Sequence, residues 1–186
     1  MGHGGNVIAE LMTDHREVEE LFEKFQVLPP GDDRRREIVD AFTIELVRHS
    51  VAEEQYLYPA VRAHVPGGAT LADKEIADHA TVERLLKELE GMAATDSRFD
   101  PLVERVISEV SEHLADEEDH LFPALADACS PQRLSELGEQ VRTAKKLAPT
   151  RPHPAAPHTP PANKLLAPGT GLVDRARDLV TGRGRS

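Results

Sequence analysis

Apolar residues recur every three or four positions along four long segments of this 186-residue chain. This spacing lines them up on one face of an α-helix, so it predicts four amphipathic helices. Proline and glycine separate the segments at residues 29–31, 66–68 and 91. The apolar stripes run from Ile8 to Phe25, from Ile38 to Tyr56, from Ile76 to Leu89 and from Leu102 to Leu121. Because short loops join long helices, we expect an all-α, antiparallel, up-down-up-down four-helix bundle.

Histidines and glutamates interrupt these stripes at positions that repeat along the chain. His15 precedes His49 by 34 residues, His79 precedes His113 by 34 residues, and the two pairs are 64 residues apart. Each pair ends with a glutamate four residues on, one helical turn along the same face. The repeat indicates a duplicated helical hairpin. A proline follows each His–Glu pair, Pro59 and Pro123, and should kink or end its helix there.

The repeated polar residues stand where core residues belong, and this predicts a metal site. Burying a single carboxylate costs several kcal/mol, so two of them beside four imidazoles require a cation. Imidazole with carboxylate suits iron better than calcium, which prefers oxygen ligands, or structural zinc, which prefers thiolates. The predicted ligands are His15, His49, Glu53, His79, His113 and Glu117.

The order and spacing of these six residues resemble the hemerythrin-like, HHE-type cation-binding domains. The resemblance extends from about Val7 to Ala128, with one histidine on each of the first and third helices and a His-x-x-x-Glu pair on each of the second and fourth. It implies two non-haem iron ions joined by carboxylate and oxo or hydroxo bridges. The histidines would then be terminal ligands, and Glu53 and Glu117 would bridge the ions.

One position departs from the oxygen-carrying members of that family, which have a fifth histidine where this chain has Glu83. Tyr56, Glu83 and His120 are the candidates to complete the coordination. An anionic oxygen ligand in place of imidazole favours Fe(III) and lowers the reduction potential. We therefore expect catalase-like handling of hydrogen peroxide or a related oxidant, in a role in oxidative stress. The alternatives are a protein that binds O2 or NO, or senses iron or oxygen, without turnover, and a purely structural role for the metals.

Other polar residues are expected to lie outside the site. Asp14 and Asp78 each precede a ligand histidine and should carry helix-surface charge, because neighbouring helix residues point apart; the alternative is an outer-sphere hydrogen bond to the histidine. Tyr58 is off the stripe and should pack against a neighbouring helix. Three further histidines belong to no constellation and should be exposed: His64, His153 and His158.

The chain changes character at Pro149. We assign residues 1–148 to the four-helix domain, with a further short helix from Pro131 to Lys146. Residues 149–186 contain seven prolines, six basic and two acidic residues. This composition buries little apolar surface and predicts a largely disordered tail, with a short amphipathic helix from Leu172 to Val180. Docking of a protein partner by the tail is the alternative to disorder.

Charge and composition narrow the partners. The net charge of −11 argues against nucleic acid, and no apolar run is long enough to span a membrane. The first ten residues lack a basic and apolar leader, and the single Cys129 excludes an intrachain disulfide. We expect a cytoplasmic protein whose partners are small molecules such as H2O2, O2 or NO.

Overall fold

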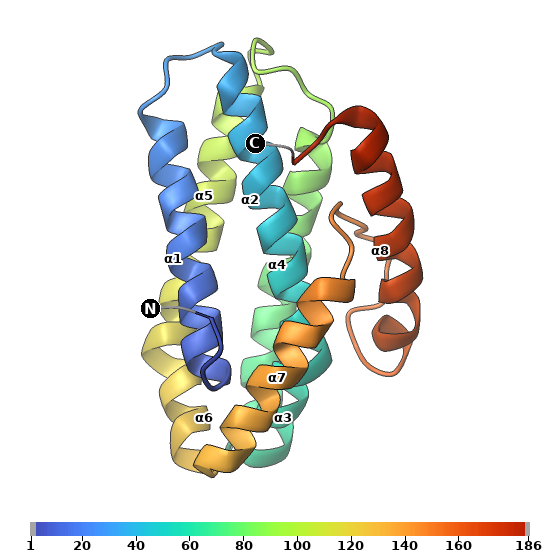
Figure 1. Cartoon of the computed structure of the whole chain (residues 1–186). Coiled ribbons are helices and arrows are strands. Elements are labelled where there is room, and N and C mark those ends of the chain that lie inside the picture. Colours follow the sequence, from blue (N-terminus) through green and yellow to red (C-terminus); the bar gives the residue numbers. More distant parts are fainter. Residues whose placement is uncertain (1–2, 185–186) are drawn as a thin grey trace.

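The computed structural model describes residues 3–184 and shows a bundle of four helical rods that alternate in direction (Figure 1). The first rod is α1 (Val7–Gln26). The second runs without interruption through α2 (Asp33–Ala52), η1 (Glu53–Leu57) and α3 (Tyr58–His64), and the third is α4 (Gly68–Leu89). The fourth runs through α5 (Phe99–Asp116), η2 (Glu117–Leu121) and α6 (Phe122–Ala128). The predicted all-α fold is confirmed, and no strand occurs within residues 3–184.

Side-chain caps fix where the first two rods begin. The side chain of Asn6 accepts a hydrogen bond from the backbone N–H of Ala9 at 3.0 Å, and Asp32 accepts one from Arg34 at 2.9 Å. Both caps satisfy N–H groups that have no partner within the helix. Gly67 precedes α4 and has a left-handed backbone conformation, with φ of 74°. Residues with a side chain rarely adopt this conformation, so glycine is favoured here.

Two apolar clusters fill the bundle, and a polar layer separates them. One cluster takes Val18, Phe22 and Phe42 with residues of α4 and α5, whereas the other takes Leu11, Leu57 and residues of α6 and α7. Every rod contributes to both clusters. The histidines and glutamates of the repeat lie between the two clusters on each rod, so they are sealed from both ends.

The second and fourth rods each contain one wide π-helical turn at the repeated glutamate. The backbone N–H of Tyr58 donates to the carbonyl of Glu53, and that of Phe122 donates to the carbonyl of Glu117, five residues back in both cases. Pro59 and Pro123 were expected to kink or end these rods. Instead, each follows the wide turn and stands in the first turn of the next α-helix, where its missing N–H is not needed. The wide turn adds one residue to the helix and so rotates all later side chains of the rod about the helix axis.

The C-terminal third of the chain wraps around one side of the bundle. The helix α7 (Pro131–Leu147) matches the predicted helix within one residue. It packs against α1, α2 and η1. The helix α8 (Ala162–Thr181) then stands at the edge of the molecule (Figure 1). None of the helices within the described residues is long and apolar enough to cross a membrane.

The structure differs from the expected disorder of the C-terminal segment over residues 149–184, and residues 185–186 lie outside the described part of the chain. The helix α8 begins ten residues before the predicted Leu172, and it is held by polar contacts instead of apolar burial. Asp174 is fully buried and accepts hydrogen bonds from the backbone N–H groups of Thr150 and Arg151 at 3.3 and 3.2 Å. Asp178, one turn on, pairs with the Arg151 guanidinium at 2.8 Å. Disorder was predicted from the low apolar content of the segment, and apolar content does not reveal docking through buried polar contacts. The boundary at residue 148 between a domain and a tail stays a prediction.

Gly171 allows α8 to approach the backbone at Ala148 closely, and a matched pair of variants tests this contact. A Cβ at Gly171 would lie 2.7 Å from the carbonyl oxygen of Ala148, whereas a Cβ at Gly169 would meet nothing within 4 Å. Overpacking costs about 1–3 kcal/mol, so Gly171→Ala should raise the undocked fraction of α8 roughly 5- to 150-fold. Limited trypsin cleavage at Lys164 and Arg177 measures that fraction. Gly169→Ala, with the same gain in helix propensity, should leave cleavage unchanged or slower; equal rates in the two variants would contradict the docking.

Candidate metal centre

The six predicted ligands meet in the polar layer between the two apolar clusters. All are at most 5% exposed, and Glu53 and Glu117 are completely buried. Their ligand atoms form two adjoining groups whose members lie within 4.8 Å of one another, and His113 and Glu117 form a further such group with Glu75. The first group is His15, His49, Glu53 and Glu117, and the second is Glu53, His79 and His113. Because Glu53 belongs to both groups, its carboxylate stands between two candidate metal positions.

Each of the two glutamates receives imidazoles from two rods. The Nε2 atoms of His49 and His79 lie 3.1 and 3.3 Å from Oε2 of Glu53. The Nε2 atoms of His15 and His113 lie 3.5 and 3.8 Å from Oε2 of Glu117. All four histidines therefore turn the same ring nitrogen, Nε2, toward the middle of the bundle.

Several of these inward atoms are buried without a hydrogen-bond partner, because the short contacts between them lack hydrogen-bond geometry. They are His15 Nε2, His49 Nε2, Glu53 Oε1 and Glu117 Oε2. Buried polar atoms are nearly always paired, since leaving one unpaired costs about 1–3 kcal/mol. Four unpaired atoms of ligand type pointing into one place fit metal ions held among them.

Without a cation, the site stabilises itself by holding protons. Burial disfavours the charged imidazolium, but the carboxylates of Glu53 and Asp14 outweigh burial and raise the pKa of His49 to about 10. Burial is likewise outweighed at His79, where Glu53 and Glu54 raise the pKa to about 10. Burial would raise the pKa of Glu53, yet His49 and His79 hold it well below its usual value. In the metal-free site, two imidazolium groups thus supply the positive charge that the Glu53 carboxylate requires.

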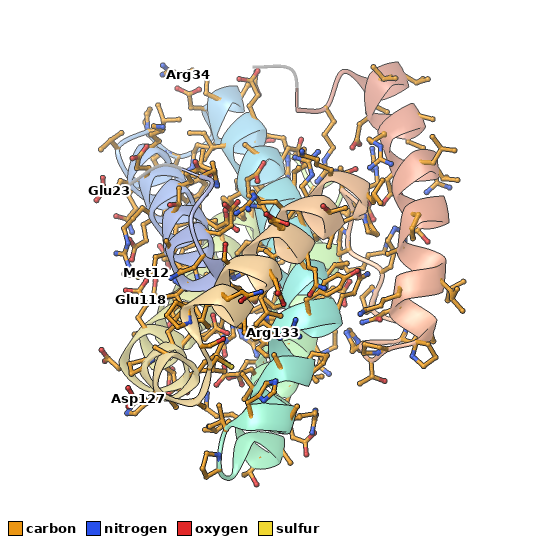
Figure 2. The ribbon with its side chains drawn as sticks, turned by 60° about the horizontal axis from the view of Figure 1, so that its bottom comes forward. Met12, Glu23, Arg34, Glu118, Asp127 and Arg133 are labelled. Atoms are coloured by element: carbon orange, nitrogen blue, oxygen red, sulfur yellow. The ribbon has the colours of Figure 1, made fainter. Side chains whose placement is uncertain are left out.

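A second set of carboxylates orients the outer nitrogen of each histidine, as is usual for metal-bound imidazole. Glu118 lies 2.8 Å from His15 Nδ1, reaching across to α1 (Figure 2). Asp14 lies 3.3 Å from His49 Nδ1, and Glu54 lies 3.2 Å from His79 Nδ1. Glu75 Oε2 lies 2.8 Å from His113 Nδ1 as an ion-pair contact without hydrogen-bond geometry. We call these four residues the outer carboxylates. They favour a proton on Nδ1 and so leave Nε2 free to bind a metal.

The outer carboxylates only partly follow the sequence-based interpretation. Asp14 was expected at the surface but is 5% exposed. Asp78, its counterpart in the repeat, has a side chain that is 40% exposed and lies 4.0 Å from His113 Nδ1, so Glu75 takes that role. Glu75 precedes His79 by one turn on the same helix. Glu54 and Glu118 could have been found, because a Glu–Glu doublet occurs at the same place in both halves of the repeat.

Each outer carboxylate has a further partner on its far side. For three of them that partner is a fixed cation: Arg16 at Glu118, Lys145 at Asp14, and Lys74 at Glu75. For Glu54 it is His158, whose Nδ1 lies 3.1 Å from Oε1 of Glu54. His158 comes from the C-terminal segment, so this segment reaches the metal centre through a single intervening carboxylate.

Tyr58, which the sequence-based interpretation placed off the site, lies in the middle of it. Its hydroxyl is 3.0 Å from Glu117 Oε1, 3.1 Å from His79 Nε2 and 3.4 Å from Glu53 Oε2. Burial raises the pKa of Tyr58 well above 10, and the neighbouring carboxylates raise it further, so the phenol is neutral here. Its counterpart in the repeat is Phe122, which stacks on His15 with ring centroids 5.5 Å apart. The two halves of the centre therefore differ by one hydroxyl group.

The structure places neither Tyr56 nor His120, the two predicted additional ligands, beside the six core residues. The Tyr56 ring packs against the Lys164 ammonium, which lies 3.9 Å from the ring centroid. The prediction assumed an α-helix after Glu53, whereas the π-helical turn brings the fifth following residue, Tyr58, to the centre instead of the third. His120 is 68% exposed at its side chain and pairs with Asp116 at 2.9 Å. The same wide turn in η2 accounts for this.

Glu83, which stands where oxygen carriers have a fifth histidine, also points away from the centre. Its carboxylate accepts a hydrogen bond from the backbone N–H of His153 at 2.8 Å. His153 and His158 are therefore part-buried contacts of the C-terminal segment and not the exposed residues that were expected. Within the part of the chain that the structure describes, the two groups at the centre contain four histidines, and His3 belongs to a separate group with Glu10 and Asp14.

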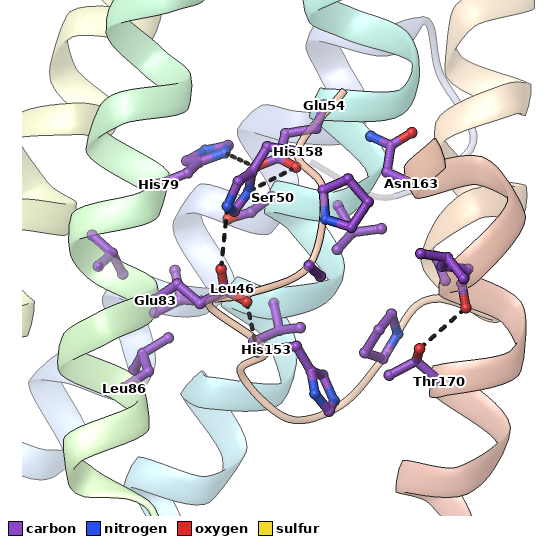
Figure 3. A pocket seen from close by; sticks show the side chains of 18 residues that line it. Leu46, Ser50, Glu54, His79, Glu83, Leu86, His153, His158, Asn163 and Thr170 are labelled. Carbon is purple, nitrogen blue, oxygen red and sulfur yellow. Dashed lines mark hydrogen bonds and ion pairs between the residues drawn. The ribbon is translucent and has the colours of Figure 1, made fainter. Parts of the chain in front are cut away.

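A cavity of about 60 Å³ lies beside His79, under the C-terminal segment (Figure 3). Apolar side chains of α2 and α4 line one side, including Leu46 and Leu86, and His153 and His158 line the other. Glu54 and the outer edge of His79 form part of its wall. A cavity of this size admits only molecules of a few atoms.

The chain is similar to known proteins over the region that holds the centre. Residues 6–125 match the profile of the hemerythrin HHE cation binding domain. The chain is 28% identical over 171 residues to an uncharacterized hemerythrin-like protein of Schizosaccharomyces pombe, covering 91% of this chain and 84% of that protein. It is 27% identical over 142 residues to a DNA nickase of Nostoc sp., covering 75% of this chain but 39% of that protein.

The fold is similar to a crystal structure of a hemerythrin HHE cation binding domain-containing protein from Mycobacterium kansasii. The TM-score is 0.67 and the identity 23%, over 76% of this chain and 85% of that chain. The resemblance inferred from the six ligand positions is thus confirmed by the profile, and the fold by this structure. The chain belongs to the hemerythrin HHE cation-binding domain family.

Proposed function

We propose that the centre binds two iron ions and decomposes hydrogen peroxide. The observation that carries the two-metal part is the pair of adjoining ligand groups that share Glu53. A mixed set of imidazole and carboxylate ligands, with no thiolate among them, suits iron. His15, His49, Glu53 and Glu117 would hold one ion, and His79, His113 and the shared Glu53 would hold the other.

The reaction needs two electrons to pass between two peroxide molecules. One molecule is oxidised to O2, releasing two electrons and two protons, and the second takes them up and becomes two molecules of water. The bound metals would supply the reversible oxidation and reduction that this exchange requires. The protein's task is to hold the ligands, admit a small reactant and move the protons.

Tyr58 is the residue placed to move a proton inside the centre. Its neutral hydroxyl donates to Glu117 and reaches both ligand groups, within 3.4 Å of Glu53. A hydroxyl in that position could donate its proton to an oxygen of the peroxide that is reduced, and regain one of the two protons released by the peroxide that is oxidised. On the other half of the repeat, Phe122 has no proton to give, so we assign proton transfer to the Tyr58 side.

The absence of a fifth imidazole from the two groups at the centre, within residues 3–184, supports turnover over reversible oxygen carriage. Glu83 accepts a hydrogen bond from the C-terminal segment, so the ion beside His79 and His113 would have few protein ligands and would keep a position for a reactant, next to the Tyr58 hydroxyl. The narrow cavity at His79 supports a reactant the size of peroxide. A stable adduct with O2 or NO, with no gas evolution from peroxide, would favour the binding or sensing alternative.

The first test concerns the shared carboxylates. Glu53→Ala and Glu117→Ala should each lower iron from about two ions per chain to one or fewer, because each removes a buried anion that faces both halves of the centre. Elemental analysis of anaerobically loaded protein measures this. His64→Ala, which changes an exposed histidine, should keep both ions. Full iron content in Glu53→Ala would show that this carboxylate does not bridge.

A second test uses the protons held by the metal-free centre. The raised pKa values of His49 and His79 mean that their imidazolium forms stabilise the metal-free fold below pH 6.5, and that this contribution is lost as the pH rises toward about 10. Metal binds the neutral form, so affinity should rise with pH through the same window. Loading with Fe(II) at pH 7 should release about two protons per chain in an anaerobic pH-stat titration. Uptake of metal without proton release would contradict the assigned ligands.

A third test compares the two tyrosines, which are two residues apart. Tyr58→Phe should keep the iron but lower peroxide turnover about 100-fold, in the range typical of a lost proton-transfer group. Tyr56→Phe should change neither quantity. Oxygen evolution per iron in the two variants decides between them. Equal turnover in both variants, or a visible phenolate-to-iron band removed by Tyr56→Phe, would contradict the placement of Tyr58.

A further inference from the structure

The outer face of α8 carries most of the exposed large apolar side chains of the structure. Of the eight such residues within positions 3–184, six lie on this helix: Leu165, Leu166, Leu172, Val173, Leu179 and Val180. Their exposed fractions range from 52% to 88%. A monomeric protein rarely leaves so large a contiguous apolar patch in water.

The spacing of these residues is that of a helix-packing stripe. Leu165, Leu172 and Leu179 are seven residues apart, and Leu166, Val173 and Val180 repeat the same interval one position on. A seven-residue repeat keeps side chains on one face of a helix over its whole length. Gly169 and Ala176 lie between them on the same face, and small residues allow a second helix to approach closely. The buried residues of α8 lie on the opposite face: Asn163, Ala167, Gly171, Asp174 and Asp178.

We propose that two copies of this chain pair through α8, antiparallel, about a two-fold axis that passes between residues 172 and 173. In this register every apolar residue of the stripe meets an apolar residue of the second copy. Leu172 lies opposite Val173 of the partner subunit, and Leu166 lies opposite Leu179 of the partner subunit. Leu165 lies opposite Val180 of the partner subunit, and the small residue Gly169 lies opposite Ala176 of the partner subunit.

The charged residues of α8 are compatible with this register, because they leave the stripe itself apolar. Lys164, Arg175 and Arg177 lie at the edges of the stripe and none within it. The antiparallel register places them across from Thr181, Thr170 and Pro168 of the partner subunit, so no two like charges are opposed. The two acidic residues of the helix, Asp174 and Asp178, are buried against the bundle.

The size of the stripe sets the expected strength of the dimer. A helix of 20 residues is about 30 Å long, and one such helix pair buries an area at the low end of stable interfaces. The rest of the chain is strongly acidic, so the two bodies repel one another. We therefore expect a dimer that dissociates in the micromolar range and becomes tighter as salt screens the repulsion. Lys164, Arg175 and Arg177 beside the stripe would also suit an anionic lipid surface, whereas the strongly acidic rest of the chain opposes it.

Sedimentation equilibrium of the full chain, metal-free and iron-loaded, from about 1 to 300 µM tests the dimer. The average mass should rise from 20.4 kDa toward twice that value. Leu172→Glu should weaken association at least tenfold, and its far-UV circular dichroism should stay unchanged because the side chain is 67% exposed. Val27→Glu is the matched control, since Val27 is 81% exposed but lies at the end of α1. It should associate like the parent chain.

A charge pair tests the register separately. Leu165→Glu alone should weaken the dimer, and adding Val180→Lys to the same chain should restore association, because the two positions face each other across the axis. Adding Val173→Lys instead should not restore it. A monomer at every concentration, association unaffected by Leu172→Glu, or binding of α8 only to phosphatidylserine vesicles would overturn the proposal. The outcome does not depend on peroxide turnover, so it stands apart from the proposed function.

Discussion

The structure depends on two carboxylates buried at the centre of a helical bundle. Glu53 and Glu117 are completely buried and face each other across the rods, between two apolar clusters that exclude water from both ends. Such charges are tolerated only with positive charge beside them. The imidazolium groups of His49 and His79 supply it in the metal-free protein, and metal ions would supply it when bound. The arrangement of the ligands, their outer carboxylates and the outermost cations follows from this requirement.

The wide turns at the glutamates decide which side chains join the centre. In a regular helix, the residues one turn after Glu53 would be Tyr56 and Leu57. The π-helical hydrogen bond from Tyr58 to Glu53 adds a residue and brings the Tyr58 hydroxyl to the ligands. The same turn after Glu117 brings Phe122 onto His15. One backbone feature, repeated in both halves, thus gives a proton donor on one side and an apolar wall on the other.

The fold and the meeting of the six candidate ligand residues in one layer could be predicted from the sequence because both rest on periodicity. Apolar spacing predicts helices, and a polar residue recurring in register within the apolar stripe predicts a shared site. Tyr58 could not be placed in this way, because a helix-wheel argument assumes an unbroken α-helix. The docking of α8 was missed for a different reason. Asp174 and Asp178 bind backbone N–H groups and Arg151, and composition records none of these contacts.

In the proposed centre, Glu53 would lie between two metal ions held by the four rods. The most direct measurement is diffraction from crystals of the iron-loaded protein at wavelengths on either side of the iron absorption edge. The account predicts two anomalous peaks about 3.5–4 Å apart, with the Glu53 carboxylate touching both. One of them should lie beside His15 and His49 and the other beside His79 and His113. A single peak, or two peaks that do not share Glu53, would contradict it.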